Sequence, residues 1–136
     1  PWKKRGTSAG FSDAPKTWLP IPPEHRELAV DQQTRNPGSM LNFYRNLLAW
    51  RKTHPALRKG RLKLLPADPQ LLGYERRLDD DALLCVFNFS GKKARLPLPR
   101  GWADGVIDEG SGLTGAEIRR GALVLGPWSG AVLIRP

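Results

Sequence analysis

The stretch that decides the fold of this chain is residues 36–57, NPGSMLNFYRNLLAWRKTHPAL, which predicts one long amphipathic helix. Asn36 is expected to cap its first turn, Pro37 to take the first helical position, and Pro55 to end it after His54. Five large apolar residues share one helix face: Met40, Phe43, Tyr44, Leu47 and Leu48. Burying them is worth roughly 7–15 kcal/mol, comparable to the stability of a whole domain. We therefore expect this face to be covered.

No second helix is expected in the sequence to cover that face. We expect it to pack on the chain's own β-region, on a copy of the chain or in aggregates. The sequence has neither an initiator Met nor the charged-then-apolar plan of a signal peptide at its start. Together these features lead us to expect that the 136 residues belong to a longer protein.

The sequence after about residue 58 predicts an antiparallel β-sandwich, because short apolar runs alternate with turns. The expected strands are residues 61–65, 71–78, 82–89, 92–98, 105–109, 121–125 and 129–134. Residues 82–89 are apolar on both faces and should be central, whereas residues 92–98 alternate and should form an edge strand with one solvated face. Residues 79–81 are expected to form a tight turn. The fold class is thus α+β, mainly β.

The segment before the helix, residues 1–35, is rich in Pro, Gly and charge and shows little periodicity. Such a long structureless stretch is typical of a functional loop or of a missing structural context. The predicted domain organisation is therefore residues 1–58, loop plus helix, followed by residues 59–136, the β-sandwich.

Composition bounds the location and partners of the chain. No apolar run approaches the roughly 18 residues of a transmembrane helix, and no membrane partner is expected. Cys85, the single cysteine, lies within the apolar run LLCVFNF and is expected to be a small buried hydrophobe. With no disulfide framework, a reducing compartment is expected, and we predict a cytoplasmic protein.

The net charge of +9 would favour nucleic acid if the charge were concentrated. The basic residues instead form three separate groups: Lys3 to Arg5; Arg58, Lys59, Arg61 and Lys63; and Arg119 with Arg120. A solvated basic surface is the simpler interpretation, and no nucleic-acid partner is expected.

Few residues suggest catalysis. Asp108 and Glu109 are neighbours on a predicted strand, so their side chains should point to opposite faces. His25 and His54 stand apart from any Cys or Ser arrangement and are expected at loops or helix ends. We therefore predict no catalytic residue, no metal site and no cofactor in this chain.

Several segments resemble, in order and spacing, the C-terminal part of α-glucosidases in the α-amylase family of glycoside hydrolases, with the closest similarity to oligo-1,6-glucosidases and related intracellular bacterial enzymes. The similarity is carried by Trp2, SAGF at residues 8–11, WLP at 18–20, SMLNFYR at 39–45, WRK at 50–52, HPAL at 54–57, LLCVFNFS at 83–90 and PWSGAVL at 127–133. It covers nearly the whole chain.

This resemblance implies an anatomy. Residues 1–35 would be the later part of a loop over the active site of a (β/α)₈ barrel, and the helix would be the last barrel helix. The catalytic carboxylates of the family belong to earlier strands, so the missing N-terminal barrel portion is the implied partner and oligosaccharide the implied substrate. Trp2 and Phe11 would lie at the substrate entrance or anchor the loop. Lys3 stands where the family commonly has Asp.

Three functional hypotheses follow. The first is the C-terminal portion of a retaining α-glucosidase, inactive by itself and supplying scaffold and loop. The second is a carbohydrate-binding β-sandwich module, suggested by five Trp residues. The third is a basic nucleic-acid-binding domain, suggested by the charge.

Overall fold

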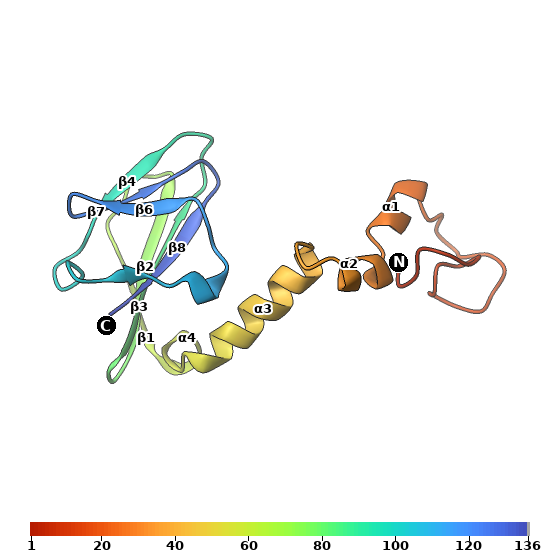
Figure 1. Ribbon diagram of the computed structural model, residues 1–136, viewed down its shortest axis with the longest axis horizontal. Helices are drawn as coiled ribbons and strands as arrows, with labels where there is room; N and C mark the ends of the chain where they lie inside the picture. Colours follow the sequence, from red (N-terminus) through yellow and green to blue (C-terminus); the bar gives the residue numbers. More distant parts are fainter. Residues whose placement is uncertain (136) are drawn as a thin grey trace. The chain divides into compact units, whose positions relative to one another are not determined.

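The computed structural model describes residues 1–135 and divides into two units, Pro1–Asn46 and Leu47–Pro136. The first unit holds α1 (Pro23–Glu27), α2 (Val30–Arg35) and the first turns of α3 (Met40–Thr53). The second begins within α3 and continues through α4 (Ala56–Lys59), the strands and a 3₁₀ turn, η1 (Glu109–Ser111) (Figure 1). None of the helices in the described residues is both long and apolar enough to span a membrane.

The strands of the second unit are all antiparallel and form two sheets (Figure 1). The five-stranded sheet has the order β1 (Arg61–Leu64), β2 (Leu71–Leu78), β3 (Asp81–Asn88), β8 (Gly130–Ile134) and β5 (Val106–Ile107). The three-stranded sheet has the order β4 (Ala94–Pro97), β7 (Ala122–Leu125) and β6 (Ala116–Arg119). The prediction of an antiparallel, mainly β region after the long helix is therefore confirmed.

One apolar core joins the two sheets. The five-stranded sheet contributes Leu71, Leu84, Val86, Ala131 and Leu133, and the three-stranded sheet contributes Ala94, Leu96, Leu123 and Leu125. Trp102, fully buried, packs in the same cluster. Along β4, Ala94 and Leu96 are buried and their neighbours exposed, so this strand turns one apolar face to the core.

The two predictions about strand position are confirmed. β3 lies between β2 and β8, and residues 82–86 are all buried. β4 is an edge strand with one solvated face. Leu78 pairs with Asp81, so the expected tight turn connects β2 to β3 through Asp79, at φ 53°, and Asp80.

One strand escaped the sequence analysis. β6 reads AEIR and carries two charged side chains that face solvent, so it shows no apolar run. It pairs with β7 through a two-residue turn in which Arg120 and Gly121 have φ of 46° and 69°. Positive φ at both turn residues matches the twist of a hairpin, but arginine is not the residue that normally marks such a turn.

The predicted helix exists, but its expected start is wrong. α3 begins at Met40, and the hydroxyl of Ser39 caps it by accepting from the Asn42 backbone N–H at 3.2 Å. Asn36 instead follows the end of α2, and its side-chain oxygen accepts from the Gly38 N–H at 3.0 Å. The expectation of a structureless segment over residues 1–35 is also wrong, since α1 and α2 lie within it.

Three of the five side chains on the apolar face of α3 remain exposed in this chain, while Phe43 and Leu47 are partly buried. Met40, Tyr44 and Leu48 retain 64%, 55% and 52% of their accessible surface, and no residue of the helix is fully buried. Only its last turns contact the outer face of the five-stranded sheet, where Trp50 packs on a small cluster around Leu83. The expectation that the whole face is covered is therefore wrong for Met40, Tyr44 and Leu48.

Cys85 is buried in that outer cluster, as expected, with 2% of its surface exposed. Burial raises the pKa of its thiol to about 11, although a hydrogen bond with Tyr74 acts in the opposite direction. The thiol is therefore protonated near neutral pH and behaves as a small apolar side chain.

Candidate functional site

The segment that carries Trp2 and Phe11 is a folded loop at the start of the first unit. The backbone N–H groups of Trp2 and Lys3 both donate to the carbonyl of Ala9 at 3.0 Å, which closes the loop. Gly10 has φ of 80°, and a Cβ there would lie 3.0 Å from the Cβ of Trp2. Glycine is therefore required at the position where the chain crosses back over Trp2.

The two short helices hold this loop in place. The Arg26 guanidinium of α1 donates to the carbonyls of Lys4, Gly6 and Thr7 at 3.1, 2.9 and 3.2 Å. Asp31 of α2 accepts from the Lys4 backbone N–H at 3.0 Å. Because these bonds reach main-chain atoms, they fix the path of the loop whatever its side chains are.

A mainly apolar depression of about 520 Å³ lies beside the loop, within the size range of small-molecule sites. Its lining includes Phe11, Lys16, Trp18, Leu19, Pro22 and His25. Trp18 keeps 96% of its surface exposed, and Phe11 53%. Exposed aromatic faces of this kind can stack on the apolar side of a sugar ring.

Of the two residues predicted for a substrate entrance, Phe11 lines the depression and Trp2 does not. Trp2 keeps 59% of its surface exposed at the crossing of the loop. The sequence analysis did not assign Trp18 to the site, although the run WLPIPP, apolar and without helical or strand periodicity, is the pattern of an apolar loop wall. His25 lies in α1 and contributes to the same wall.

Carboxylates are absent from the described lining of the depression. The first unit contains four of them, Asp13, Glu24, Glu27 and Asp31. Glu27 forms an ion pair with Lys4 at 2.6 Å, and Asp31 is bound to backbone. Glycosidic hydrolysis requires two carboxylates on either side of the bond, and the described lining supplies neither.

A second polar cluster lies where α3 ends on the second unit. His54 stands between two carboxylates, with Nδ1 3.5 Å from Asp81 and Nε2 3.4 Å from Asp108. The Asp108 carboxylate accepts from the Trp50 indole N–H at 2.8 Å, and Asp81 accepts from the Ala56 N–H at 2.7 Å. Sequence spacing gives no sign of this cluster, because its members lie far apart in the chain.

Asp108 does not lie on a strand with Glu109, as the sequence had suggested. It caps η1, accepting from the Gly110 N–H at 2.8 Å. With both carboxylates already bonded to protein donors, the cluster fastens the end of α3 to the sheet. Among residues 1–135, no group of three or more His, Cys, Asp and Glu side chains is arranged to hold a metal ion.

Comparison with known families divides the chain into two consecutive parts. Residues 1–60 match the family model "Alpha amylase, catalytic domain", and residues 62–132 match "Maltogenic Amylase, C-terminal domain". The boundary predicted between residues 58 and 59 stays a prediction.

Curated relatives include a probable alpha-glucosidase of Rhizobium meliloti, 41% identical over 90 residues, which are 66% of this chain and 16% of that protein. The probable oligo-1,6-glucosidase 2 of Bacillus subtilis is 38% identical over 96 residues, 70% of this chain and 17% of that protein. The mouse amino acid transporter heavy chain SLC3A1 is 35% identical over 94 residues, 68% of this chain and 14% of that protein. The chain thus spans about a sixth of the length of these relatives.

Among solved structures, the α-glucosyl transfer enzyme XgtA superposes with a TM-score of 0.86 at 31% identity, over 100% of this chain and 25% of that one. The similarity extends through both units, including the loop and the short helices of residues 1–35.

Proposed function

This chain belongs to the α-amylase family of glycoside hydrolases, and we propose that it forms the C-terminal portion of a retaining α-glucosidase that hydrolyses terminal α-glucosidic bonds of oligosaccharides. The observation that supports this most directly is the order of the two family matches, catalytic domain over residues 1–60 and C-terminal domain over residues 62–132. The glucosidase relatives at 38–41% identity supply the proposed substrate class.

In this proposal the chain supplies scaffold and loop, and the catalytic carboxylates lie on the barrel portion outside these residues. Residues 1–35 contribute to the wall of the active site. α3 is the last barrel helix, and its exposed Met40, Tyr44 and Leu48 pack on that barrel. The β-region from residue 59 onward is the C-terminal β-sandwich domain of the enzyme.

Trp2 and Phe11 are proposed to lie at the substrate entrance, with Phe11 the better placed because it lines the apolar depression. An aromatic face there would raise affinity for substrate without taking part in bond cleavage. Replacing Phe11 by Ala in an active assembly should therefore raise KM and leave kcat nearly unchanged. A fall in kcat with unchanged KM would contradict this role.

A chimera tests the proposal. This chain replaces the matching C-terminal segment of the B. subtilis relative, and the product is assayed with p-nitrophenyl α-glucoside beside the 136-residue chain alone. We expect the chimera to release p-nitrophenol, with α-glucose as the first anomer, and the chain alone to release none. The matched control is the same chimera with Leu48→Asp, which places a charge on the apolar helix face and should prevent assembly.

Three outcomes would overturn the proposal: turnover by the chain alone, a folded chimera without activity, or full activity with Leu48→Asp. Products in which glucose is joined to a second sugar would indicate glucosyl transfer in place of hydrolysis. That distinction matters because XgtA is described as a glucosyl transfer enzyme.

The alternative of a carbohydrate-binding module is favoured by one observation, the exposure of Trp2, Trp18 and Trp128 at 59%, 96% and 72%. Calorimetric titration of the chain alone with maltose and isomaltose separates the two functions, because a module binds without the barrel. Heat and a Trp emission change would support the module, and their absence would remove it.

Partners and location follow from the same proposal. The barrel portion is the partner of the α3 face, and in its absence we expect self-association through that face. A reducing, cytoplasmic location suits the free, buried Cys85, and fractionation of the source cells tests it.

A further inference from the structure

A basic depression lies at the β1 edge of the five-stranded sheet, and it shares no lining residue with the depression beside Phe11. Its volume is about 610 Å³, and its charged lining consists of Lys59, Arg61, Lys63 and Arg77 with Glu75 and Asp79. No residue of β1 is buried, so the inner face of this edge strand is open to solvent.

Strand register explains why these cations meet. In the pairing of β1 with β2, Arg61 lies directly opposite Arg77, and Lys63 lies opposite Glu75. Residues paired across antiparallel strands share one face, and like charges in that position repel each other. Lys59 ends α4 just before the strand begins and adds a further charge.

The cations of the depression have no ion-pair partner within residues 1–135. The ion pairs found there are Lys4 with Glu27, Arg119 with Glu117, and His54 with two aspartates. Glu75, one of the two acids of the lining, accepts from the indole N–H of buried Trp102 at 3.1 Å.

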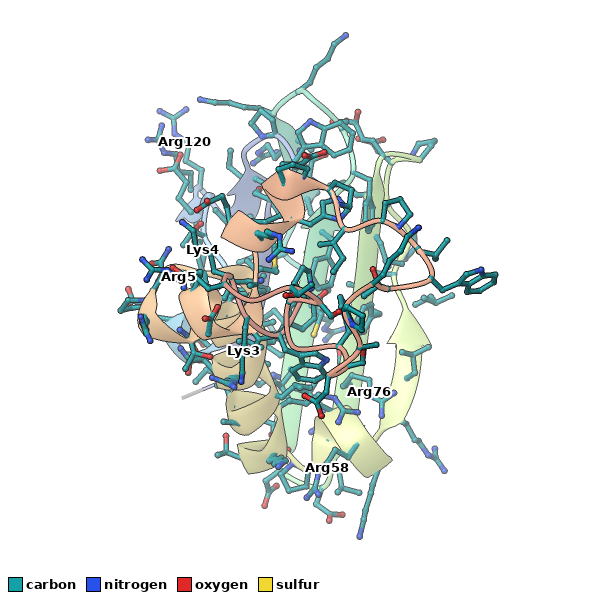
Figure 2. The ribbon with its side chains drawn as sticks, turned by 90° about the vertical axis from the view of Figure 1, so that its right-hand side faces the viewer. Lys3, Lys4, Arg5, Arg58, Arg76 and Arg120 are labelled. Atoms are coloured by element: carbon teal, nitrogen blue, oxygen red, sulfur yellow. The ribbon has the colours of Figure 1, made fainter. Side chains whose placement is uncertain are left out.

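A second basic depression, of about 620 Å³, lies on the three-stranded sheet and is lined by Arg95, Arg119 and Arg120, but Arg119 is already paired with Glu117 at 2.9 Å. Figure 2 shows Arg58 and Arg76 near one end of the second unit and Arg120 near the opposite end. Arg76 donates to the Ala56 carbonyl at 3.0 Å, on the outer face of the sheet. The positive charge of the depression at the β1 edge is therefore local. It favours a small anion over a long polyanion such as a nucleic acid, which would need a continuous row of basic side chains.

We propose that this depression binds a small phosphate-bearing solute, with the guanidinium groups of Arg61 and Arg77 as its principal ligands. Guanidinium forks match phosphate oxygens in bidentate geometry, and lysines add point charge. An anion bound between Arg61 and Arg77 would attract both guanidinium groups and offset the repulsion between them. The lining contains no aromatic side chain on which a sugar ring or a base would stack, so recognition is by charge.

The test uses the 136-residue chain and inorganic pyrophosphate in isothermal titration at low salt. We expect saturable one-to-one binding, weakened about tenfold or more in Arg61→Ala/Arg77→Ala. The control is Arg119→Ala/Arg120→Ala, which removes the same charge from the second basic depression, on the other sheet, and should change affinity less than about twofold. Glucose 1-phosphate in a parallel titration distinguishes a sugar phosphate from free phosphate groups.

A thermal melt keeps the proposal testable if a variant changes the fold. Without ligand, Arg61→Ala/Arg77→Ala should melt no lower than the original chain, since it removes repulsion. With pyrophosphate, the melting temperature should rise for the original chain and the control only. Equal loss of affinity in both variants, or heat that never saturates, would overturn the proposal.

Discussion

Removal of the Asp108 carboxylate is the perturbation with the clearest expected cost. One side chain, 14% exposed, accepts from the Trp50 indole N–H at 2.8 Å, caps η1 through Gly110 at 2.8 Å, and lies 3.4 Å from His54. Asp108→Ala therefore removes two hydrogen bonds and leaves the half-buried indole without an acceptor.

The magnitude follows from those contacts. A hydrogen bond to a charged, largely buried group is worth about 1.5–3 kcal/mol, and loss of a capping side chain costs about 1 kcal/mol. Because the two bonds share one carboxylate, the terms do not fully add, and we expect a loss of about 2–4 kcal/mol in the free energy of unfolding of the second unit. Asp108→Asn offers a single acceptor oxygen, so it should lose about half of that.

Urea unfolding followed by tryptophan emission measures this loss, since fully buried Trp102 reports on the core of the second unit. Glu117→Ala is the matched control. Glu117 also pairs with a cation, Arg119 at 2.9 Å, but the two side chains are 49% and 70% exposed, so its removal should cost less than about 0.5 kcal/mol.

A double-mutant cycle isolates the indole contact. Combined with Trp50→Phe, Asp108→Ala should show a coupling energy of about 1–2 kcal/mol. A loss no larger than that of the Glu117 control, or a coupling energy near zero, would refute the assignment of the cluster as the fastening of α3 to the sheet.

Three further predictions concern other parts of the chain. Burial raises the pKa of the Cys85 thiol from 9.0 to about 11. Above pH 9 the unfolded state therefore loses this proton first, and the free energy of unfolding should fall between about pH 9 and 11. Urea unfolding across that range should show a smaller fall in Cys85→Ala. Ser39→Ala removes the α3 cap from the Asn42 N–H and should cost about 1 kcal/mol, measured as faster hydrogen exchange in the first helical turn. Tyr44→Ser/Leu48→Ser should shift the chain toward monomer in sedimentation, and an unchanged association state would exclude this face as the contact.

Strand pattern was the part of the structure most accessible from sequence. β3 was placed centrally because residues 82–86 are apolar on both faces, and its position between two neighbours buries both. β4 was placed at an edge by simple alternation. β6 was missed for the converse reason: its outward charges hide the period, and its turn uses Arg120 at positive φ.

Helix boundaries were less accessible, because two residues compete for the cap. Asn36 and Ser39 are both good capping types, and Pro37 favours a start directly after Asn36. The structure uses Ser39, whose hydroxyl also donates to the Gln33 carbonyl at 2.7 Å. That second bond depends on α2, and the sequence of α2 has no helical spacing of apolar residues that would have predicted it.

The polar clusters could not be predicted from spacing at all. His54 and Asp108 are brought together by the packing of α3 on the five-stranded sheet, and Arg61 and Arg77 by strand register. The first pair depends on where α3 ends against the sheet, and the second on strand register, which is set by the turns and the core and not by local sequence.

The α3 face and the depression beside Phe11 place different demands on a partner. Burying Met40, Tyr44 and Leu48 is worth about 5–9 kcal/mol at roughly 1.5–3 kcal/mol for each side chain, which is enough to decide whether two portions of a protein stay together. The depression offers a few exposed aromatic contacts, of the kind that holds a sugar weakly. We therefore expect the helix face to govern assembly and the loop to modulate substrate affinity. Changes at Leu48 should abolish the activity of the chimera, whereas changes at Phe11 should only raise its KM.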